Sequence, residues 1–188
     1  MRLFIAIKPD SNVFNAIKAF QTELRSACPY KEIRWVDPNQ FHLTLQFLGE
    51  INPSYLPKLN ANLNAVAENS KTFNLHYESI GFFGSAVKPR VLWLGSKKSS
   101  ELKELFNQVL TSTAFLQIEN PGRLTPHITL ARFSDNINKE DALKISNYIN
   151  SLGKPDFGIT KTEAIELIES KLTPYGPIYK TLNKFNLR

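Results

Sequence analysis

The sequence predicts an α+β fold built from two similar lobes. Apolar stripes at helical spacing alternate with short strand-like runs, and the strand-like runs come largely in pairs. In addition, one four-residue phrase occurs twice, almost half the chain apart. Helices that alternate with paired strands favour α+β layers over a doubly wound parallel sheet. The repeat favours two related lobes that face each other across a groove.

The first part of the chain contains three predicted strands and two predicted helices. The strands are apolar or alternating runs bounded by turn residues, and the third stops at Gly49: 3–7, 33–36 and 41–48. Asp10 or Ser11 can cap the first helix, whose apolar stripe is Val13, Ile17, Phe20 and Leu24. Pro53 opens the second helix, whose stripe is Leu56, Leu59, Leu63 and Val66.

The rest of the chain contains five predicted strands and two predicted helices. Gly81, Gly84 and Pro89 separate the first two strands, and Pro174 and Gly176 separate the last two. The strands cover residues 73–80, 90–94, 126–133, 164–170 and 178–185, and the helices cover residues 99–110 and 141–149. No low-complexity linker interrupts the chain, so we expect residues 1–188 to form a single bilobal domain.

The composition excludes several classes of protein. Hydrophobic residues make up 42% of the chain and charged residues 21%, which predicts a packed core and not wholesale disorder. The single cysteine, Cys28, excludes an internal disulfide and a Cys-rich zinc site. No apolar run is long enough for a signal peptide or a membrane helix. We therefore expect a soluble, cytoplasmic protein, and a monomer.

The net charge favours a phosphate-bearing partner. It is +6 at neutral pH, with an isoelectric point near 9.4. A generic solubilising surface explains the same charge equally well. No block of Lys and Arg marks a dedicated nucleic-acid tail.

The repeated phrase carries the chemistry: His42-Leu43-Thr44-Leu45 and His127-Ile128-Thr129-Leu130. Each copy alternates polar and aliphatic residues, as a half-buried strand does, so the histidine and the threonine share one face. A neutral imidazole accepts a proton and a charged one donates it, and both states exist near neutral pH. Two histidines on opposite sides of a phosphodiester can therefore act as base and acid. The threonine hydroxyls can hold the non-bridging oxygens.

Other interpretations of these residues are less specific. A single histidine in a strand is usually structural, and we interpret His76 in this way. Two histidines can also bind a metal. Neither phrase, however, has the nearby acids or further histidines that would complete a metal shell, so we expect neither a metal nor another cofactor.

The chain resembles the two-histidine (2H) phosphoesterase superfamily, and within it the LigT-like RNA 2′,3′-cyclic phosphodiesterases. The resemblance covers nearly the whole chain. Beyond the two phrases it includes Arg2-Leu3-Phe4-Ile5-Ala6-Ile7, Arg34-Trp35-Val36, Gln46-Phe47-Leu48-Gly49, Pro89-Arg90-Val91-Leu92-Trp93-Leu94-Gly95, Ala131-Arg132, Glu169-Ser170-Lys171 and Gly176-Pro177-Ile178-Tyr179.

The resemblance implies two pseudo-symmetric lobes, each with an antiparallel sheet and outer helices, around a central cleft. It implies metal-independent opening of a 2′,3′-cyclic phosphate, on an RNA end or a nucleotide, to the 2′-phosphate. By analogy His42 is the acid that protonates the departing 3′ oxygen, and His127 is the base that activates water. Thr44 and Thr129 hold phosphate oxygens. Some relatives also join RNA ends through a 2′-5′ linkage.

Arg132 and Phe47 are further candidates, for phosphate binding and nucleotide contact respectively. Each stands five residues after its histidine, so strict alternation places it on the opposite face. These side chains reach the cleft only if each strand bends or bulges after the fourth residue of its phrase. Without a bulge, Phe47 is a core residue and Arg132 a surface ion-pair partner.

Two other functions fit the same residues. One is a non-catalytic module that binds RNA ends, which the positive charge favours and the two histidines oppose. The other is a two-histidine enzyme that acts on another small phosphodiester.

Overall fold

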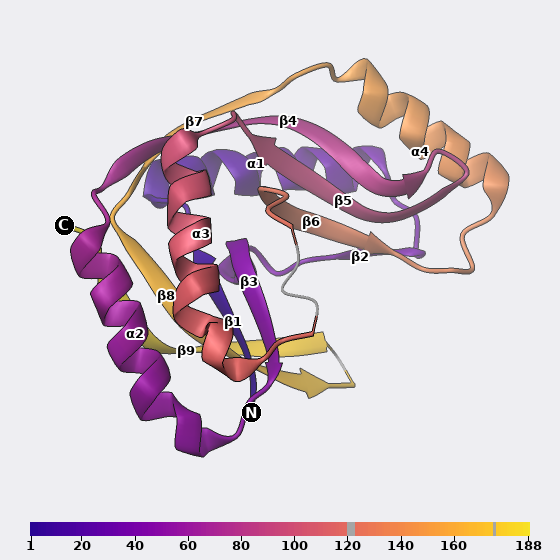
Figure 1. Ribbon diagram of the computed structural model, residues 1–188. Coiled ribbons are helices and arrows are strands. Elements are labelled where there is room, and N and C mark those ends of the chain that lie inside the picture. Colours follow the sequence, from indigo (N-terminus) through magenta and orange to yellow (C-terminus); the bar gives the residue numbers. More distant parts are fainter. Residues whose placement is uncertain (120–122, 175) are drawn as a thin grey trace.

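One antiparallel sheet carries the fold (Figure 1). The computed structural model describes residues 1–119, 123–174 and 176–188. Within these residues nine strands form a sheet in the order β7-β4-β5-β6-β3-β1-β8-β9, and β2 pairs with β6. The pairings are antiparallel, and helices pack against the sheet, so the predicted α+β class is confirmed.

The strands are β1 (Arg2–Ile7), β2 (Ile33–Trp35), β3 (Leu43–Glu50), β4 (Phe73–Ser85), β5 (Lys88–Ser96), β6 (His127–Phe133), β7 (Asp156–Thr162), β8 (Ala164–Thr173) and β9 (Gly176–Asn186). The α-helices are α1 (Ser11–Ala27), α2 (Leu56–Asn69), α3 (Ser100–Thr113) and α4 (Lys139–Ser151). Short 3₁₀ helices are η1 (Pro38–Gln40), η2 (Pro53–Tyr55) and η3 (Ala114–Leu116). None of the helices within the described residues is both long enough and apolar enough to cross a membrane.

The sheet divides into two lobes where β3 meets β6. One lobe contains β3, β1, β8 and β9, with α3 packed against β3 and α2 against β9. The other contains β6, β5, β4, β7 and β2, with α1 packed against β7 and α4 against β4 and β5. The predicted bilobal arrangement is confirmed. The lobes nevertheless share one sheet, and they interleave in sequence, because β2 joins the second lobe while β8 and β9 return to the first.

Strand β1 shows how the two faces of the sheet differ. Leu3, Ile5 and Ile7 alternate along β1 and belong to the main core, together with apolar residues of the helices. Phe4 and Ala6 point to the opposite face, where they form a small separate cluster with Ile168 and Tyr179. One face of this lobe is therefore covered by helices, and the other carries a thin apolar layer next to His42.

The hairpin of β4 and β5 is longer than the sequence suggests. Gly81 was expected to interrupt the strands, but β4 continues through it to Ser85, and β5 begins at Lys88. The side chain of Trp93, on the neighbouring strand, fills the space beside Gly81, where an added Cβ would lie 2.7 Å from the indole ring. This glycine makes room for a tryptophan and does not break the strand.

Three other strand predictions need correction. β7 was not predicted, because its seven residues include Gly158 in a left-handed conformation (φ 94°) that interrupts the alternation. β3 begins at Leu43 and not at Phe41, because residues 38–40 form η1. It also continues through Gly49 to Glu50. The remaining predicted elements are confirmed, with ends that differ by a few residues.

Shortening Leu43 should destabilise the protein much more than shortening an exposed leucine. Leu43 is 0% exposed at the junction of the lobes, whereas Leu172 in β8 is 67% exposed. We expect Leu43→Ala to lower the free energy of unfolding by about 2–5 kcal/mol and Leu172→Ala by about 0.5 kcal/mol or less. Urea unfolding followed by circular dichroism measures both, and similar losses would contradict the position given to Leu43.

Candidate active site

The two lobes meet through one register pair, Leu43 of β3 with Ile128 of β6. Both side chains are 0% exposed and belong to the main core. Successive residues of a strand point to opposite faces, so the residues on either side of this pair point away from the core. These neighbours are the histidines and threonines of the two repeated phrases. All four therefore lie on one face, at the junction of the lobes.

The register also decides which of these groups adjoin. One residue beyond the Leu43–Ile128 pair in each direction, His42 lies across from Thr129, and Thr44 lies across from His127. This register places each histidine position opposite a threonine position of the other strand. Among the residues that the structure describes, no hydrogen bond engages either threonine hydroxyl. Both hydroxyls are available to a ligand.

Both histidines are held in the same way. Nδ1 of His42 donates to the carbonyl oxygen of Gln40 at 2.6 Å, and Nδ1 of His127 donates to that of Thr125 at 2.6 Å. In each case the acceptor is the residue two positions earlier. A carbonyl oxygen only accepts, so Nδ1 carries the hydrogen, and Nε2 of the neutral ring is left as the proton acceptor.

Gln40 also connects His42 to strand β9. Its side-chain amide donates to the carbonyl oxygen of Pro177 at 2.7 Å, while its own carbonyl accepts from His42. Tyr179, two residues further along β9, meets the His42 ring edge to face at 5.3 Å. Sequence reasoning gave no role to Gln40 or Tyr179, because Pro177 and Gln40 lie far apart in the chain and nothing local links them.

Aromatic rings line the site on both sides. Phe4 lies 4.8 Å from the His42 ring, and Phe83 lies 5.0 Å from the His127 ring, edge to face. Tyr179 also packs against Phe4 at 5.1 Å. His42 is therefore enclosed by two rings, whereas His127 has one aromatic contact. None of these rings was predicted to lie in the site.

The surroundings lower the pKa of both histidines. Burial lowers the pKa of His42 to about 4, and the nearby charges of His127, Lys8 and Arg132 act in the same direction, against the hydrogen bond to Gln40. Burial and Arg132 also lower the pKa of His127, against its bond to Thr125. Both rings are therefore neutral at pH 7 when the site is empty.

Each phrase carries a β-bulge at its fourth residue, Leu45 in β3 and Leu130 in β6. In β1, the neighbours Ile5 and Ala6 pair with Gln46 and Thr44, so Leu45 has no partner. In β5, Leu92 and Trp93 pair with Ala131 and Thr129, so Leu130 has none. The residues that follow, Gln46 and Ala131, are buried as well. The bulge reverses the alternation at the same place in both strands.

The two bulges meet the condition under which Phe47 and Arg132 face the cleft. Phe47 is 63% exposed and lies 6.0 Å from Phe4, on the histidine side of the sheet. The charge of Arg132 lowers the pKa of both histidines and also acts on Tyr179. The structure thus brings together all six candidate residues: His42, Thr44, Phe47, His127, Thr129 and Arg132.

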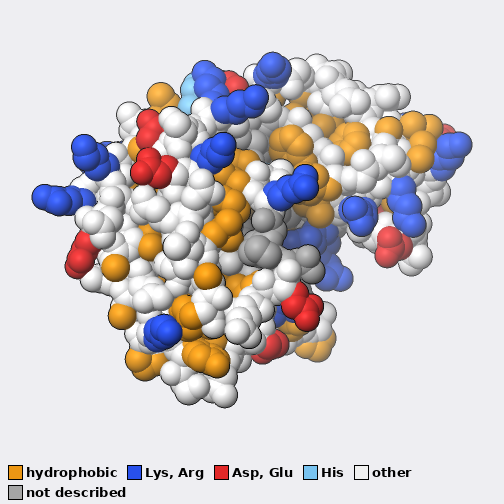
Figure 2. All heavy atoms as spheres, viewed as in Figure 1, with side chains coloured by type: hydrophobic (Ala, Val, Ile, Leu, Met, Phe, Trp, Pro, Cys, Tyr) orange, Lys and Arg blue, Asp and Glu red, His pale blue; other side chains and the backbone are white. Residues whose placement is uncertain are grey.

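Charged residues surround this face. Lys8 forms an ion pair with Glu166 at 2.8 Å, and Thr181 donates to the same carboxylate at 2.7 Å. Figure 2 shows the surface hollowed between the α4 side of the molecule and the β8–β9 hairpin, with Lys and Arg side chains gathered around the hollow. The arrangement suits an anionic ligand.

The third histidine lies elsewhere. Nε2 of His76 is 2.8 Å from both carboxylate oxygens of Asp156, on the neighbouring strand β7. This pair joins β4 to β7, which agrees with a structural interpretation of His76. Among the described residues, no group of three or more His, Cys, Asp or Glu side chains is arranged to hold a metal ion.

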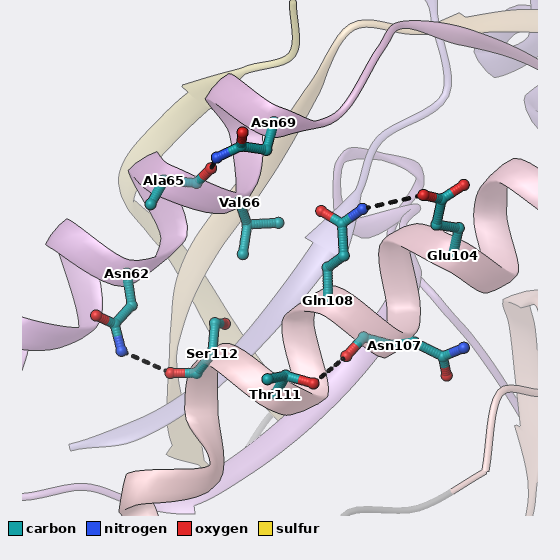
Figure 3. Close-up of a pocket in the computed structure, with 9 residues that line it drawn as sticks. All are labelled: Asn62, Ala65, Val66, Asn69, Glu104, Asn107, Gln108, Thr111 and Ser112. Atoms are coloured by element: carbon teal, nitrogen blue, oxygen red, sulfur yellow. Dashed lines mark hydrogen bonds between the residues drawn. The ribbon is translucent and has the colours of Figure 1, made fainter.

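A second hollow lies between α2 and α3 (Figure 3). Amide side chains dominate its lining, and three of them donate hydrogen bonds there: Asn62 to the carbonyl of Ser112 at 2.7 Å, Asn69 to that of Ala65 at 2.8 Å, and Gln108 to the carboxylate of Glu104 at 3.5 Å. Glu104 is its one titratable residue. It lacks an acid–base pair, so the histidine face remains the candidate active site.

Comparisons with known proteins identify the family of the chain. A family model described as LigT like phosphoesterase matches residues 7–93. The RNA 2′,3′-cyclic phosphodiesterase of Archaeoglobus fulgidus is 30% identical over 185 residues, which cover 98% of this chain and 99% of that protein.

Solved structures share the fold. The crystal structure of TT0787 of Thermus thermophilus has a TM-score of 0.83 and 30% identity, and the match covers 100% of this chain and 98% of that one. Escherichia coli LigT complexed with 3′-AMP has a TM-score of 0.76 and 24% identity, and the match covers 99% of this chain and 97% of that one.

Removing the Gln40 side-chain amide should disturb His42 and leave His127 unchanged. Gln40→Met keeps the length but cannot donate to Pro177, so the carbonyl that holds His42 loses its anchor. We expect His42 to become a mixture of tautomers, with a loss of stability of about 1 kcal/mol. ¹⁵N NMR of the imidazoles measures the tautomers. Thr125→Val, the matched change beside His127, should leave both rings as they are, and an unaltered His42 in Gln40→Met would contradict the link.

Proposed function

The chain belongs to the LigT-like phosphoesterase family, and we propose that it hydrolyses 2′,3′-cyclic phosphates at RNA ends to 2′-phosphates, with His42 and His127 as acid and base. One observation carries this proposal: two imidazoles held by equivalent carbonyl bonds face the same side of the Leu43–Ile128 junction. The name of the Archaeoglobus relative supports the choice of substrate.

In the proposed reaction water attacks the phosphorus atom of the cyclic phosphate. Nε2 of His127 takes the proton of the water as the new P–O bond forms. The bond from phosphorus to the 3′ oxygen breaks, and that oxygen takes a proton from Nε2 of His42. The phosphate stays on the 2′ oxygen. Because each Nδ1 hydrogen is bonded to a carbonyl, both proton transfers occur at Nε2.

The remaining candidates act on the phosphate and the nucleoside. In this proposal the Thr44 and Thr129 hydroxyls donate to the non-bridging oxygens, where charge grows in the transition state. The guanidinium of Arg132 adds a positive charge. The exposed ring of Phe47 offers a surface on which a base can stack. A 5′-hydroxyl in place of water would join two RNA ends through a 2′-5′ linkage by the same proton transfers.

Substitution of either histidine tests the proposal directly. We expect His42→Ala and His127→Ala each to lower kcat/KM for adenosine 2′,3′-cyclic phosphate by about 10²–10⁴-fold, because each removes one proton transfer. His76→Ala is the matched control and should retain activity. The assay contains EDTA, and ³¹P NMR identifies the product. A 3′-phosphate product, or a requirement for added metal, would contradict the mechanism.

A substrate with sulfur in place of the 3′ oxygen separates the two roles. A thiolate leaves without a proton, so loss of the acid matters less for this substrate. We expect the sulfur substrate to restore much of the rate in His42→Ala and little of it in His127→Ala. The opposite pattern would reverse the assignment.

The pH dependence follows from the lowered pKa values. The active free enzyme needs one proton on the histidine pair, and this proton is lost as the pH rises through the higher of the two pKa values, which lies below 6.5. We therefore expect kcat/KM to fall already above about pH 6.5, and Arg132→Gln to move this fall to higher pH. Stopped-rate assays from pH 4 to pH 9 measure it, and a plateau that extends well above neutral pH would contradict the lowered values.

A further inference from the structure

Arg34 and Arg132 lie directly opposite each other in the antiparallel pair of β2 and β6. Side chains at such positions share a face, with Cβ atoms about 5 Å apart. Ile33 and Trp35, on either side of Arg34, pack in or against the main core, so Arg34 points the other way and is exposed. Since Arg132 is on the histidine side of the sheet, Arg34 is on that side too.

This pair of like charges has no compensation in the empty protein. Within the described residues, no carboxylate lies within ion-pair distance of either guanidinium. Like charges directly opposite in a sheet are destabilising. Two forked guanidinium groups side by side suit an anion with several oxygens, such as a phosphodiester.

The position of the pair fits a second phosphate next to the reacting one. β2 and β3 pair with the same edge of β6, one after the other along the strand. β3 contributes one register pair, Leu43 with Ile128. His42 lies across from Thr129 and Arg34 from Arg132, three residues further along β6. This separation is about 10 Å at the usual rise of a strand, and the bulge at Leu130 shortens it. A long arginine side chain can span the rest of the distance to a neighbouring nucleotide.

We infer that Arg34 and Arg132 form a second anion site, which binds the phosphodiester on the 5′ side of the terminal nucleotide. The inference rests on the proposed function and specifies its substrate class: the 3′ end of a single-stranded RNA, and not a free cyclic nucleotide. Arg132 belongs to both sites, because its charge also reaches the histidines. Arg34 belongs to the second site alone, since it stands on β2, which carries neither histidine.

The test compares two substrates that differ in the second phosphate. Adenosine 2′,3′-cyclic phosphate has only the reacting group, whereas a hexa-adenylate that ends in a 2′,3′-cyclic phosphate also has phosphodiesters on its 5′ side. We expect Arg34→Gln to lower the ratio of kcat/KM for the hexanucleotide to kcat/KM for the mononucleotide about tenfold, mainly through KM. The slope of log KM for the hexanucleotide against log salt concentration should fall by the amount expected for about one lost phosphate contact.

Arg25→Gln is the matched control, because it removes the same charge from the exposed last turn of α1, the helix that packs against β7. It should leave the ratio at the wild-type value. An unchanged ratio in Arg34→Gln, or an equal loss on both substrates, would overturn the inference. The thermal midpoint of Arg34→Gln should equal or exceed that of the wild type, since a repulsion is removed. A clear drop would mean that Arg34 has a structural role.

A binding measurement separates this inference from the proposed function. Fluorescence anisotropy with a labelled hexa-adenylate that ends in a 2′-phosphate reports the second site without turnover. Weaker binding in Arg34→Gln than in Arg25→Gln supports the site even if the wild type hydrolyses neither substrate, an outcome that would reject the proposed function alone. Equal binding by the two variants rejects the site.

Discussion

The contact between Leu43 and Ile128 is the constraint on which the whole site depends. Their burial fixes the register of β3 against β6, and a slip of β3 by one residue would turn His42 and Thr44 into the core. Two apolar side chains therefore orient four polar ones. The bulges that follow, at Leu45 and Leu130, then bring Phe47 and Arg132 to the same face, so one short contact and two equivalent irregularities assemble all the candidate groups.

The same phrase has different surroundings in the two lobes. His42 lies between Phe4 and Tyr179, and Gln40 ties it to β9, whereas His127 meets Phe83 alone. The pKa of His42 is accordingly lowered the more strongly. In the free protein a single proton shared by the pair therefore sits mainly on His127, so the acid role proposed for His42 uses the less populated protonated form. A bound phosphate, as an anion next to both rings, would raise both pKa values again.

Much of the fold and the central site could be predicted from residue patterns. The alternation around His42 and His127 is local. The two phrases therefore predicted that each forms a strand, that its histidine and threonine share a face, and that the histidines act as an acid–base pair. The sequence could only predict that Phe47 and Arg132 face the cleft if their strands bulge. Whether a bulge forms depends on the register with the partner strand. Gly81 was misinterpreted, since only the neighbouring Trp93 explains it. The hydrogen bond of Gln40 to Pro177 and the pairing of Arg34 opposite Arg132 join distant segments, and no local pattern indicates them.

The interleaving of the lobes has a consequence for how the protein is made. β1 and β3 are synthesised early, but their lobe is completed by β8 and β9, the last strands of the sheet to leave the ribosome. Pro177 and Tyr179 reach His42 only then, whereas the carbonyl and aromatic neighbours of His127, Thr125 and Phe83, are already present. The residues around His127 therefore leave the ribosome first, and the cleft gains its full set of neighbours only after β9 has emerged.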